Sequence, residues 1–301
     1  MCKIETVFQY FTGREGAAMR ADGRLAKEKS MIASAIPYIM PKRYDAQNFI
    51  TEYADMEILR SYIHEKRKEG IRISYMTLIL AAYFRAYQDN PKINRFIMNK
   101  RIYDRNHFCV SFMMLKKRAN GMSDEACIKV FFEPGDDVLS INRKIDEQIE
   151  KNQVSTVNNN TDKFASFMLS LPVLPTLVIN LARLLDRYGL LPRKLIDLSP
   201  FHTSLFITNL ASINTNAIFH HCYEFGTTGV FISMGKPVAN YINGEYRKKL
   251  IPRACVLDER ICTGHEYALF WASFQRYLKH PEWLENGAER EKAESEEAQD
   301  K

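Results

Sequence analysis

The sequence predicts an α/β protein, and three observations indicate this fold class. Apolar runs typical of strands alternate with segments whose apolar residues recur every three or four positions. Two of the strand-like runs, at 107–115 and 126–132, flank Asn120-Gly121, a pair typical of hairpin turns. Near the C-terminus, a further apolar run passes through Thr263-Gly264 into an amphipathic helix.

The first half of the chain is expected to contain a short apolar element, one strand and two helices. A short apolar element covers 32–40, and 46–53 fits a strand. Asp55 begins an amphipathic helix, and Ser74 is the expected N-cap of a second helix at 75–89.

The second half is expected to hold more strands and two amphipathic helices that close the fold. The predicted strands are 108–115, 126–132, 204–209, 229–235 and 252–257, and the predicted helices are 136–151 and 265–280.

One segment lacks charge altogether. Residues 164–182 are nineteen uncharged residues, close to the length of a membrane span, but Pro172 and Pro175 interrupt them. We expect two short helical pieces with a kink, continued by an amphipathic stretch at 181–191. Three roles stay open: packing over the core or against another subunit, contact with a membrane surface through 164–191, and a span or lid.

These features suggest a single domain with flanking segments. The expected organisation is a polar N-terminal extension at 1–30, a domain at 31–285 with an apolar helical insertion at about 160–195, and a charged, disordered tail at 286–301.

Composition narrows the class of protein. The 301 residues are 46% hydrophobic and 26% charged, as in ordinary globular proteins, and the net charge is +6. Early basic residues could attract phosphate-bearing ligands or anionic membrane, or form a solvated face. No nucleic-acid-binding motif accompanies them, so nucleic acid is not an expected partner. The early basic residues are Arg14, Arg20, Arg24, Lys27, Lys29, Lys42 and Arg43.

Cysteine usage and the N-terminus point to a reducing compartment. The six cysteines form no CxxC pair, and Cys109, Cys127 and Cys255 lie in strand-like runs that suit buried free thiols. The N-terminal residues lack the apolar core of a signal peptide. We therefore expect a cytoplasmic protein.

Two short motifs resemble one enzyme family. Residues 259–264 read Glu-Arg-Ile-Cys-Thr-Gly, and residues 208–211 read Thr-Asn-Leu-Ala. They resemble the His-Arg-x-x-Asp-Gly and Thr-Ile-Ser-Asn-Leu-Gly segments of 2-oxo-acid dehydrogenase E2 acyltransferases, which share the chloramphenicol acetyltransferase fold. Arg260 and Gly264 match the first motif, whereas Glu259 replaces its histidine and Thr263 its aspartate.

The resemblance implies a fold and an assembly. The fold would be a two-layer α/β sandwich with a mixed β-sheet covered by helices, chloramphenicol acetyltransferase-like. The assembly would be a homotrimer with sites between subunits. The substrate would be coenzyme A or an acyl-CoA, with no metal and no lipoyl domain in this chain, and the acceptor is unidentified.

The resemblance also implies roles for particular residues. Glu259 takes the position of the base, Thr208 that of the oxyanion donor, and Thr263 that of the structural aspartate. Ser204 is a weaker candidate for the oxyanion donor, and Asn209 belongs to the same motif. Glu259 and Thr208 are expected to face each other across a tunnel at a subunit boundary.

Alternatives to these roles remain open. A glutamate serves as a base for a thiol only if burial raises its pKa. Glu259 could instead pair with a nearby arginine, such as Arg260 or one from another strand, and stay ionised. Cys262 could be an activated nucleophile or a packed thiol. His220 and His221 could line a substrate channel, while a shared metal is disfavoured because strand neighbours face opposite sides.

Two functions from different classes compete. The first is an acyl-CoA-dependent acyltransferase. The second is a catalytically inactive trimeric relative that binds acyl-CoA or a protein partner, which the loss of the histidine and the aspartate would favour. A protein of the membrane surface is a third reading, based on composition.

Overall fold

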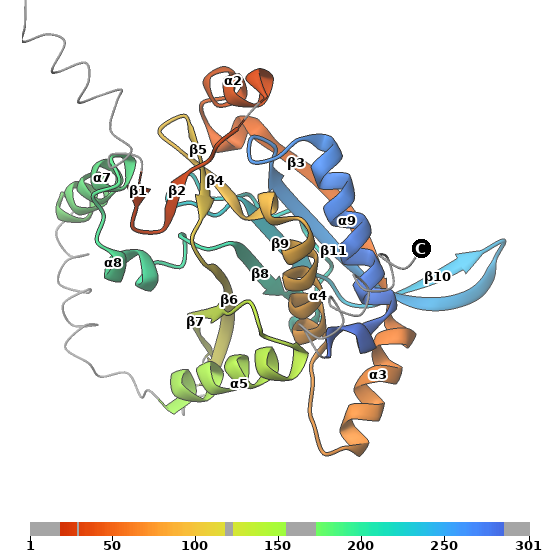
Figure 1. The fold of residues 1–301 in the computed structure, drawn as a ribbon. Helices are drawn as coiled ribbons and strands as arrows, with labels where there is room; N and C mark the ends of the chain where they lie inside the picture. The colour runs from red at the N-terminus through yellow and green to blue at the C-terminus, as the bar shows by residue number, and fades with distance from the viewer. Residues whose placement is uncertain (1–18, 29, 118–122, 155–172, 286–301) are drawn as a thin grey trace, which may run out of the picture.

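The structure, a computed structural model, describes residues 19–28, 30–117, 123–154 and 173–285 (Figure 1). The hairpin turn expected at Asn120-Gly121, the residues 164–172 of the apolar segment and the tail at 286–301 lie outside these ranges.

A large mixed sheet forms the centre of the fold. Its strand order is β10-β11-β9-β8-β6-β7, and β3 pairs with the other edge of β11. β8 is parallel to both β6 and β9, and the other pairs are antiparallel. The mixed sheet expected from the resemblance is therefore confirmed. The strands are β3 (Gln47–Asp55), β6 (Phe108–Lys117), β7 (Ser123–Phe132), β8 (Leu205–Asn209), β9 (Val230–Met234), β10 (Val238–Ile242) and β11 (Glu245–Asp258).

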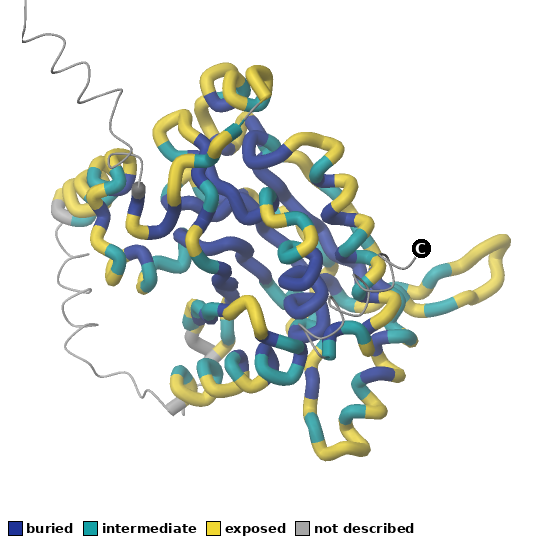
Figure 2. The backbone as a smooth tube through the Cα atoms, in the orientation of Figure 1, coloured by how far each residue is buried: buried dark blue, intermediate teal, exposed yellow. Residues whose placement is uncertain are grey.

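Four helices cover one face of this sheet. They are α3 (Met56–Lys68), α4 (Tyr75–Asp89), α5 (Val138–Val154) and α9 (Gly264–Lys279). Asp55 and Ser74 cap α3 and α4 as predicted, because each side chain accepts a backbone N–H of the first turn. α4 is buried on nearly all sides between the sheet, α5 and α9, so it forms the middle of the core (Figure 2).

The opposite face of the sheet is covered by irregular chain. A small apolar cluster of Phe206, Phe231, Val256 and Cys222 lies there under the segment 216–226. Two further helices, α7 (Leu174–Arg187) and α8 (Arg193–Leu198), lie to the side of the sheet (Figure 1). In its described part the apolar segment forms α7, which has Pro175 in its first turn. The first of the two expected helical pieces lies outside the described residues, so the kink stays a prediction.

A second, four-stranded sheet adjoins the first, in the order β1-β2-β5-β4. It joins β1 (Met19–Arg20) and β2 (Gly23–Leu25) to β4 (Arg95–Met98) and β5 (Arg101–Arg105). A turn at residues 21 and 22 joins β1 to β2, and the pairing of β2 with β5 was not predicted from the sequence. The folded part therefore includes residues from 19 onward, before the boundary expected at 31.

The remaining short elements complete the chain. They are α2 (Met31–Ile39), η2 (Arg43–Ala46), η3 (Pro91–Asn94), η4 (Leu210–Ile213) and η5 (Pro281–Leu284). Of the thiols expected to be buried, Cys109 and Cys255 are, whereas Cys127 is exposed on β7. Among the described residues, no helix has the length and apolar character needed to cross a membrane.

Candidate active site

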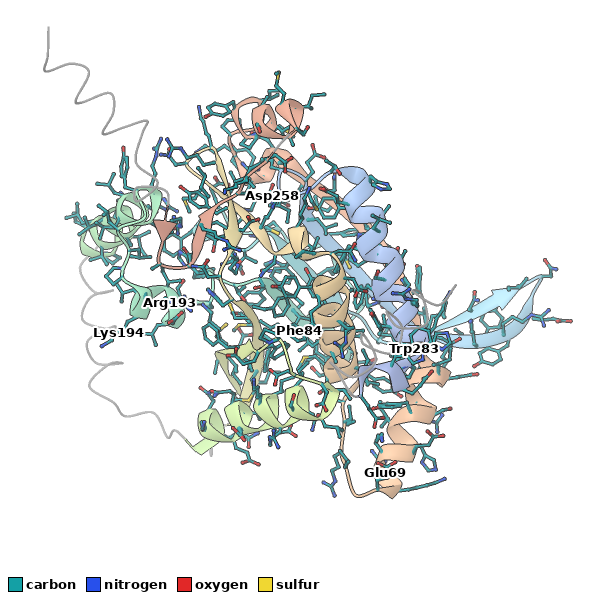
Figure 3. All side chains as sticks on the ribbon, in the orientation of Figure 1. Glu69, Phe84, Arg193, Lys194, Asp258 and Trp283 are labelled. Atoms are coloured by element: carbon teal, nitrogen blue, oxygen red, sulfur yellow. The ribbon has the colours of Figure 1, made fainter. Side chains whose placement is uncertain are left out.

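The turn after β11 is built around one buried carboxylate, that of Asp258. The Nε and Nη2 atoms of Arg260 donate to its two oxygens, each at 2.7 Å, and Arg43 Nε donates from 3.3 Å. The Asp258 backbone carbonyl accepts from the Tyr267 hydroxyl at 2.5 Å. Asp258 is fully buried and lies at the end of the sheet nearest α2 (Figure 3). Two arginines on one carboxylate therefore fix the shape of the turn.

Arg43 also holds the segment that crosses the sheet. It donates to the carbonyl oxygens of Tyr223 and Gly226, and its backbone N–H donates to Glu224 Oε2 at 2.9 Å. Gly226 has a φ of +84°, and a Cβ there would meet the Phe201 carbonyl oxygen at 2.2 Å. Only glycine fits this close approach. The segment's path thus depends on Arg43 and, through it, on Asp258.

Thr263 is a helix cap in this chain. Its hydroxyl accepts the Glu266 backbone N–H at 3.4 Å, and Glu266 Oε2 accepts the Thr263 N–H at 2.8 Å. This reciprocal arrangement is a capping box at the start of α9. Gly264 follows, and a Cβ there would meet nothing within 4 Å. The structural task that the resemblance assigned to position 263 is met by Asp258, since Asp258 holds the arginines.

Glu259 follows Asp258 and is partly exposed. Its backbone N–H donates to the Ala46 carbonyl at 2.9 Å. The alternative in which Glu259 pairs with Arg260 is wrong, because Arg260 is committed to Asp258. Within the described residues, no ion pair involves the Glu259 carboxylate.

Thr208 lies near the C-terminal end of β8, where it pairs with Ser233 of β9. It is partly exposed, and its hydroxyl forms no hydrogen bond with another described residue. Ser204 differs: it is buried at the start of β8, and its hydroxyl accepts the Cys109 backbone N–H at 3.1 Å. Of the two candidate oxyanion donors, Thr208 is the partly exposed one, and its hydroxyl has no hydrogen-bond partner among the described residues.

Within one copy, Thr208 and Glu259 lie at opposite ends of the sheet. Thr208 is paired with Ser233 on β9, and Ser233 is paired with Ala254 on β11, so Thr208 lies level with Ala254. Glu259 comes directly after Asp258, whose backbone N–H donates to the Gly229 carbonyl just before β9. The register separates them by about 17 Å along the strands and about 10 Å across them. The two side chains do not meet in a single chain.

His220 and His221 lie on the segment that crosses the sheet face. The His220 ring stacks on Phe231, with ring centroids 4.1 Å apart, and on His221 at 4.8 Å. The expectation that they face opposite sides is wrong, because they lie in irregular chain rather than in a strand. The described residues contain no group of three or more His, Cys, Asp or Glu side chains that could hold a metal ion.

Cys262 is a packed thiol. It is buried, and burial raises the pKa of its thiol to about 12. The thiolate that a nucleophile requires is therefore scarce at neutral pH.

A cleft adjoins the motif at residues 208–211. It has a volume of about 570 Å³ and is lined by Asn209 at the end of β8, by Ala211 of η4, and by α3 and the start of α4. Three basic side chains on one side of α3 line it: Arg60, His64 and Arg67. Asn209 Oδ1 is buried and has no hydrogen-bond partner among the described residues. The cleft thus combines positive charge with an unused acceptor.

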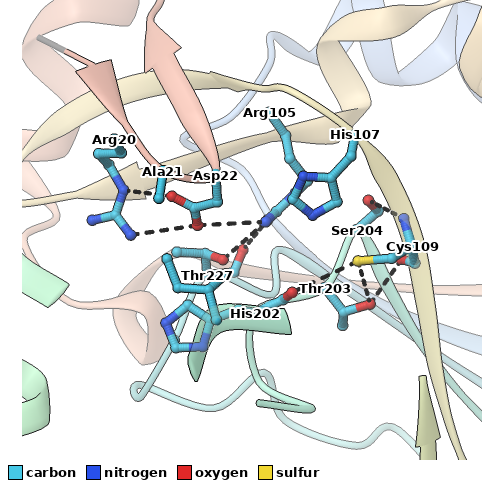
Figure 4. A network of polar contacts seen from close by, with 12 residues as sticks. Arg20, Ala21, Asp22, Arg105, His107, Cys109, His202, Thr203, Ser204 and Thr227 are labelled. Carbon is cyan, nitrogen blue, oxygen red and sulfur yellow. Dashed lines mark hydrogen bonds and ion pairs between the residues drawn. The ribbon is translucent and has the colours of Figure 1, made fainter. Parts of the chain in front are cut away.

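A polar network at the Glu259 end of the sheet was not predicted from the sequence (Figure 4). Arg20 donates to Asp22, and Arg105 donates to Thr227 Oγ1 at 3.0 Å. Arg20 Nη2 also lies 2.5 Å from Asp186 Oδ1 on α7. Only proximity in space could reveal this group, since its members come from distant parts of the chain.

Asp186 is also bonded to a histidine. His202 Nε2 lies 3.1 Å from Asp186 Oδ2, and His202 Nδ1 lies 2.7 Å from Ser199 Oγ. Burial by itself would raise the pKa of Asp186, but the bonds and charges of His202 and Arg20 lower it. The arrangement resembles a catalytic triad in connectivity, yet His202 is fully buried and Asp186 is neutralised by Arg20. It anchors α7 to the body of the protein.

Solved structures with the same fold are acyltransferases. No family model and no curated protein matches the sequence. A probable dihydrolipoamide acetyltransferase from Listeria monocytogenes matches with a TM-score of 0.52 at 13% identity, covering 85% of this chain and 94% of that one. The dihydrolipoamide acetyltransferase of Azotobacter vinelandii gives 0.53 at 12%, covering 86% and 94%. A chloramphenicol acetyltransferase gives 0.51 at 13%, covering 85% and 100%. The chain therefore has the chloramphenicol acetyltransferase-like fold.

Proposed function

We propose that the chain is an acyltransferase that moves an acyl group from a coenzyme A thioester to a hydroxyl, amine or thiol acceptor. The observation that carries this proposal is that the Thr208 hydroxyl is partly exposed near the end of β8 and forms no hydrogen bond with another described residue. The motif resemblance assigns the role of oxyanion donor to this residue. The likeness to acetyltransferases supports the reaction class.

The proposed reaction needs one base and one donor. Glu259 removes the proton from the acceptor as it attacks the thioester carbonyl. The Thr208 hydroxyl donates a hydrogen bond to the tetrahedral oxyanion. The intermediate collapses with loss of the coenzyme A thiolate, which takes back the proton from Glu259. The Glu259 carboxylate forms no ion pair within the described residues, which leaves it available to an acceptor.

The proposed site is shared between copies. Since Thr208 and Glu259 lie at opposite ends of one sheet, a catalytic pair requires Thr208 from one copy and Glu259 from the next. We propose a homotrimer in the cytoplasm, in which each boundary brings the two ends together.

The coenzyme is proposed to enter by the cleft beside Asn209. Arg60 and Arg67 would bind its phosphates, and apolar residues such as Ile73 and Ile251 would contact the pantetheine arm. Asn209 Oδ1 would accept one of its amide N–H groups.

The test is release of free thiol from acetyl-CoA and longer acyl-CoAs in the presence of an acceptor panel. Thr208→Val should lower kcat by about 100-fold or more, as for the loss of an oxyanion donor. Thr51→Val, at an exposed threonine of β3, is the matched control and should keep the wild-type rate. Equal rates for the two variants would remove Thr208 from the mechanism.

A specific observation also favours the non-catalytic alternative. The turn at 258–263 is held by Asp258 and the Thr263 cap, so it keeps its shape without the histidine and aspartate of the resembling family. Under this alternative the trimer binds acyl-CoA or a protein partner. Tight acyl-CoA binding by calorimetry, with no thiol release from any acceptor, would select it.

A further inference from the structure

Helix α7 presents an apolar stripe to solvent. Leu177, Leu181, Leu184 and Tyr188 recur at four- and three-residue steps, and each is 52–60% exposed. Such a stripe normally faces a core or a partner. The helix is attached through its last turn, where Asp186 bonds to Arg20 and His202.

Helix α2 exposes apolar residues in the same way. Met31, Ile32, Tyr38 and Ile39 are each more than 60% exposed. The β4–β5 turn joins the two helices: Lys100 Nζ lies 5.5 Å from the centre of the Tyr38 ring on α2. On the other side of this turn, Arg187 Nε of α7 donates to Asn99 Oδ1 at 3.0 Å. The two helices and the turn lie along one side of the molecule (Figures 1 and 2).

A basic cleft of about 370 Å³ lies between the helices. Lys42, Lys100, Arg183 and Arg187 line it, and none of the four forms an ion pair within the ranges that the structure describes. The two acidic residues that line the cleft already have partners elsewhere in the chain. Asp186 is paired with Arg20, and the Glu224 carboxylate accepts the Arg43 backbone N–H.

We propose that α2, α7 and the basic cleft between them form a docking surface for an anionic lipid membrane. The cations would bind lipid phosphates, and the apolar side chains of the two helices would enter the acyl boundary. A two-fold contact with a second copy would bring the same four cations against one another, whereas an anionic bilayer complements both the charge and the apolar area. The helices would lie at the membrane surface and would not cross it. This contact would place the acyl-transfer site beside a membrane, but the docking proposal does not depend on acyl transfer.

The test is flotation of the full chain with vesicles of phosphatidylcholine alone and of phosphatidylcholine with phosphatidylserine. Binding to the anionic vesicles and little binding to the neutral ones is expected. Lys42→Gln/Arg183→Gln should weaken anionic binding by about 30-fold, since each juxtamembrane cation contributes about fivefold. Neither side chain forms a hydrogen bond or ion pair with another described residue, so the fold should be kept.

A second variant tests the apolar part. Leu177→Ser/Leu181→Ser should weaken binding by about tenfold or more. The matched controls are Lys249→Gln/Lys279→Gln, which removes the same charge from exposed positions elsewhere, and Leu269→Ser on the exposed side of α9. Both controls should bind as the wild type does.

Three results would overturn the proposal. The first is the absence of wild-type binding to anionic vesicles, and the second is an equal loss of binding in the test and control variants. The third is an oligomer that Leu177→Ser/Leu181→Ser dissociates in sedimentation experiments while no variant binds vesicles, which would make this side an interface between copies.

Discussion

Replacing Asp258 by asparagine tests the structural basis of the candidate site. Asparagine keeps the shape of the side chain but removes its charge and one acceptor oxygen. Arg43 and Arg260, which are 3% and 5% exposed, would then share no counter-charge. Loss of one partner from a buried ion pair costs about 3–5 kcal/mol of the free energy of unfolding. We expect Asp258→Asn to fall in this range.

The assay is urea unfolding at neutral pH, followed by circular dichroism. Asp45→Asn, at an exposed aspartate of η2, is the matched control and should change the free energy of unfolding by less than about 0.5 kcal/mol. Hydrogen exchange gives a second readout, because Arg43 links Asp258 to the segment 222–226. Exchange in that segment should be faster in Asp258→Asn.

A cost below about 1 kcal/mol would refute this reasoning. A double-mutant cycle of Asp258→Asn with Arg43→Met gives a further check. The two changes should be non-additive by about 0.5–3 kcal/mol, since both remove the same contact.

Three further changes have defined outcomes. Burial lowers the pKa of His107 to about 3, below the ordinary 6.5. As pH falls, this histidine is therefore protonated in the unfolded chain before it is protonated in the folded one. The free energy of unfolding then drops by up to about 1.4 kcal/mol per pH unit between pH 6.5 and 3. His107→Leu should therefore show a flatter loss of stability in urea unfolding between pH 7 and 5.5, and an unchanged slope would contradict this. Arg253 is fully buried, and its guanidinium nitrogens have no hydrogen-bond partner among the described residues; Arg253→Met should leave the free energy of unfolding unchanged or raise it by about 1–4 kcal/mol, and a large loss would reveal a partner. Thr263→Ala should lower the free energy of unfolding by about 1 kcal/mol, because it removes the cap of α9. Thermal unfolding measures this change, and Thr51→Val, measured in the same way, should be nearly neutral.

The sequence predicts the periodic elements of this fold well. α4 begins and ends at the predicted residues, because its apolar stripe and the Ser74 cap are local signals. The addition of β1 and β2 to the second sheet, in which β1 pairs with β2 and β2 with β5, could not be predicted in this way. These strands are two and three residues long, too short for an alternation to be recognised.

The candidate site was predictable only in part. The motif resemblance located the turn at 258–264, but not the residue that holds it. Asp258 and Arg43 are 215 residues apart, and no local pattern connects them. For the same reason the exposure of α7 was left open: periodicity shows the stripe, while the distant contacts of Asp186 with Arg20 and His202 decide which way it faces.

Subunit complementation tests the central claim of a shared acyl-transfer site most directly. Thr208→Val and Glu259→Gln chains should each release little thiol, and co-expression should restore activity, because a mixed trimer contains boundaries with both intact groups. Random assembly predicts about a quarter of the wild-type rate. A co-expressed sample no more active than either variant alone, beside an active wild type, would contradict a site shared by Thr208 and Glu259.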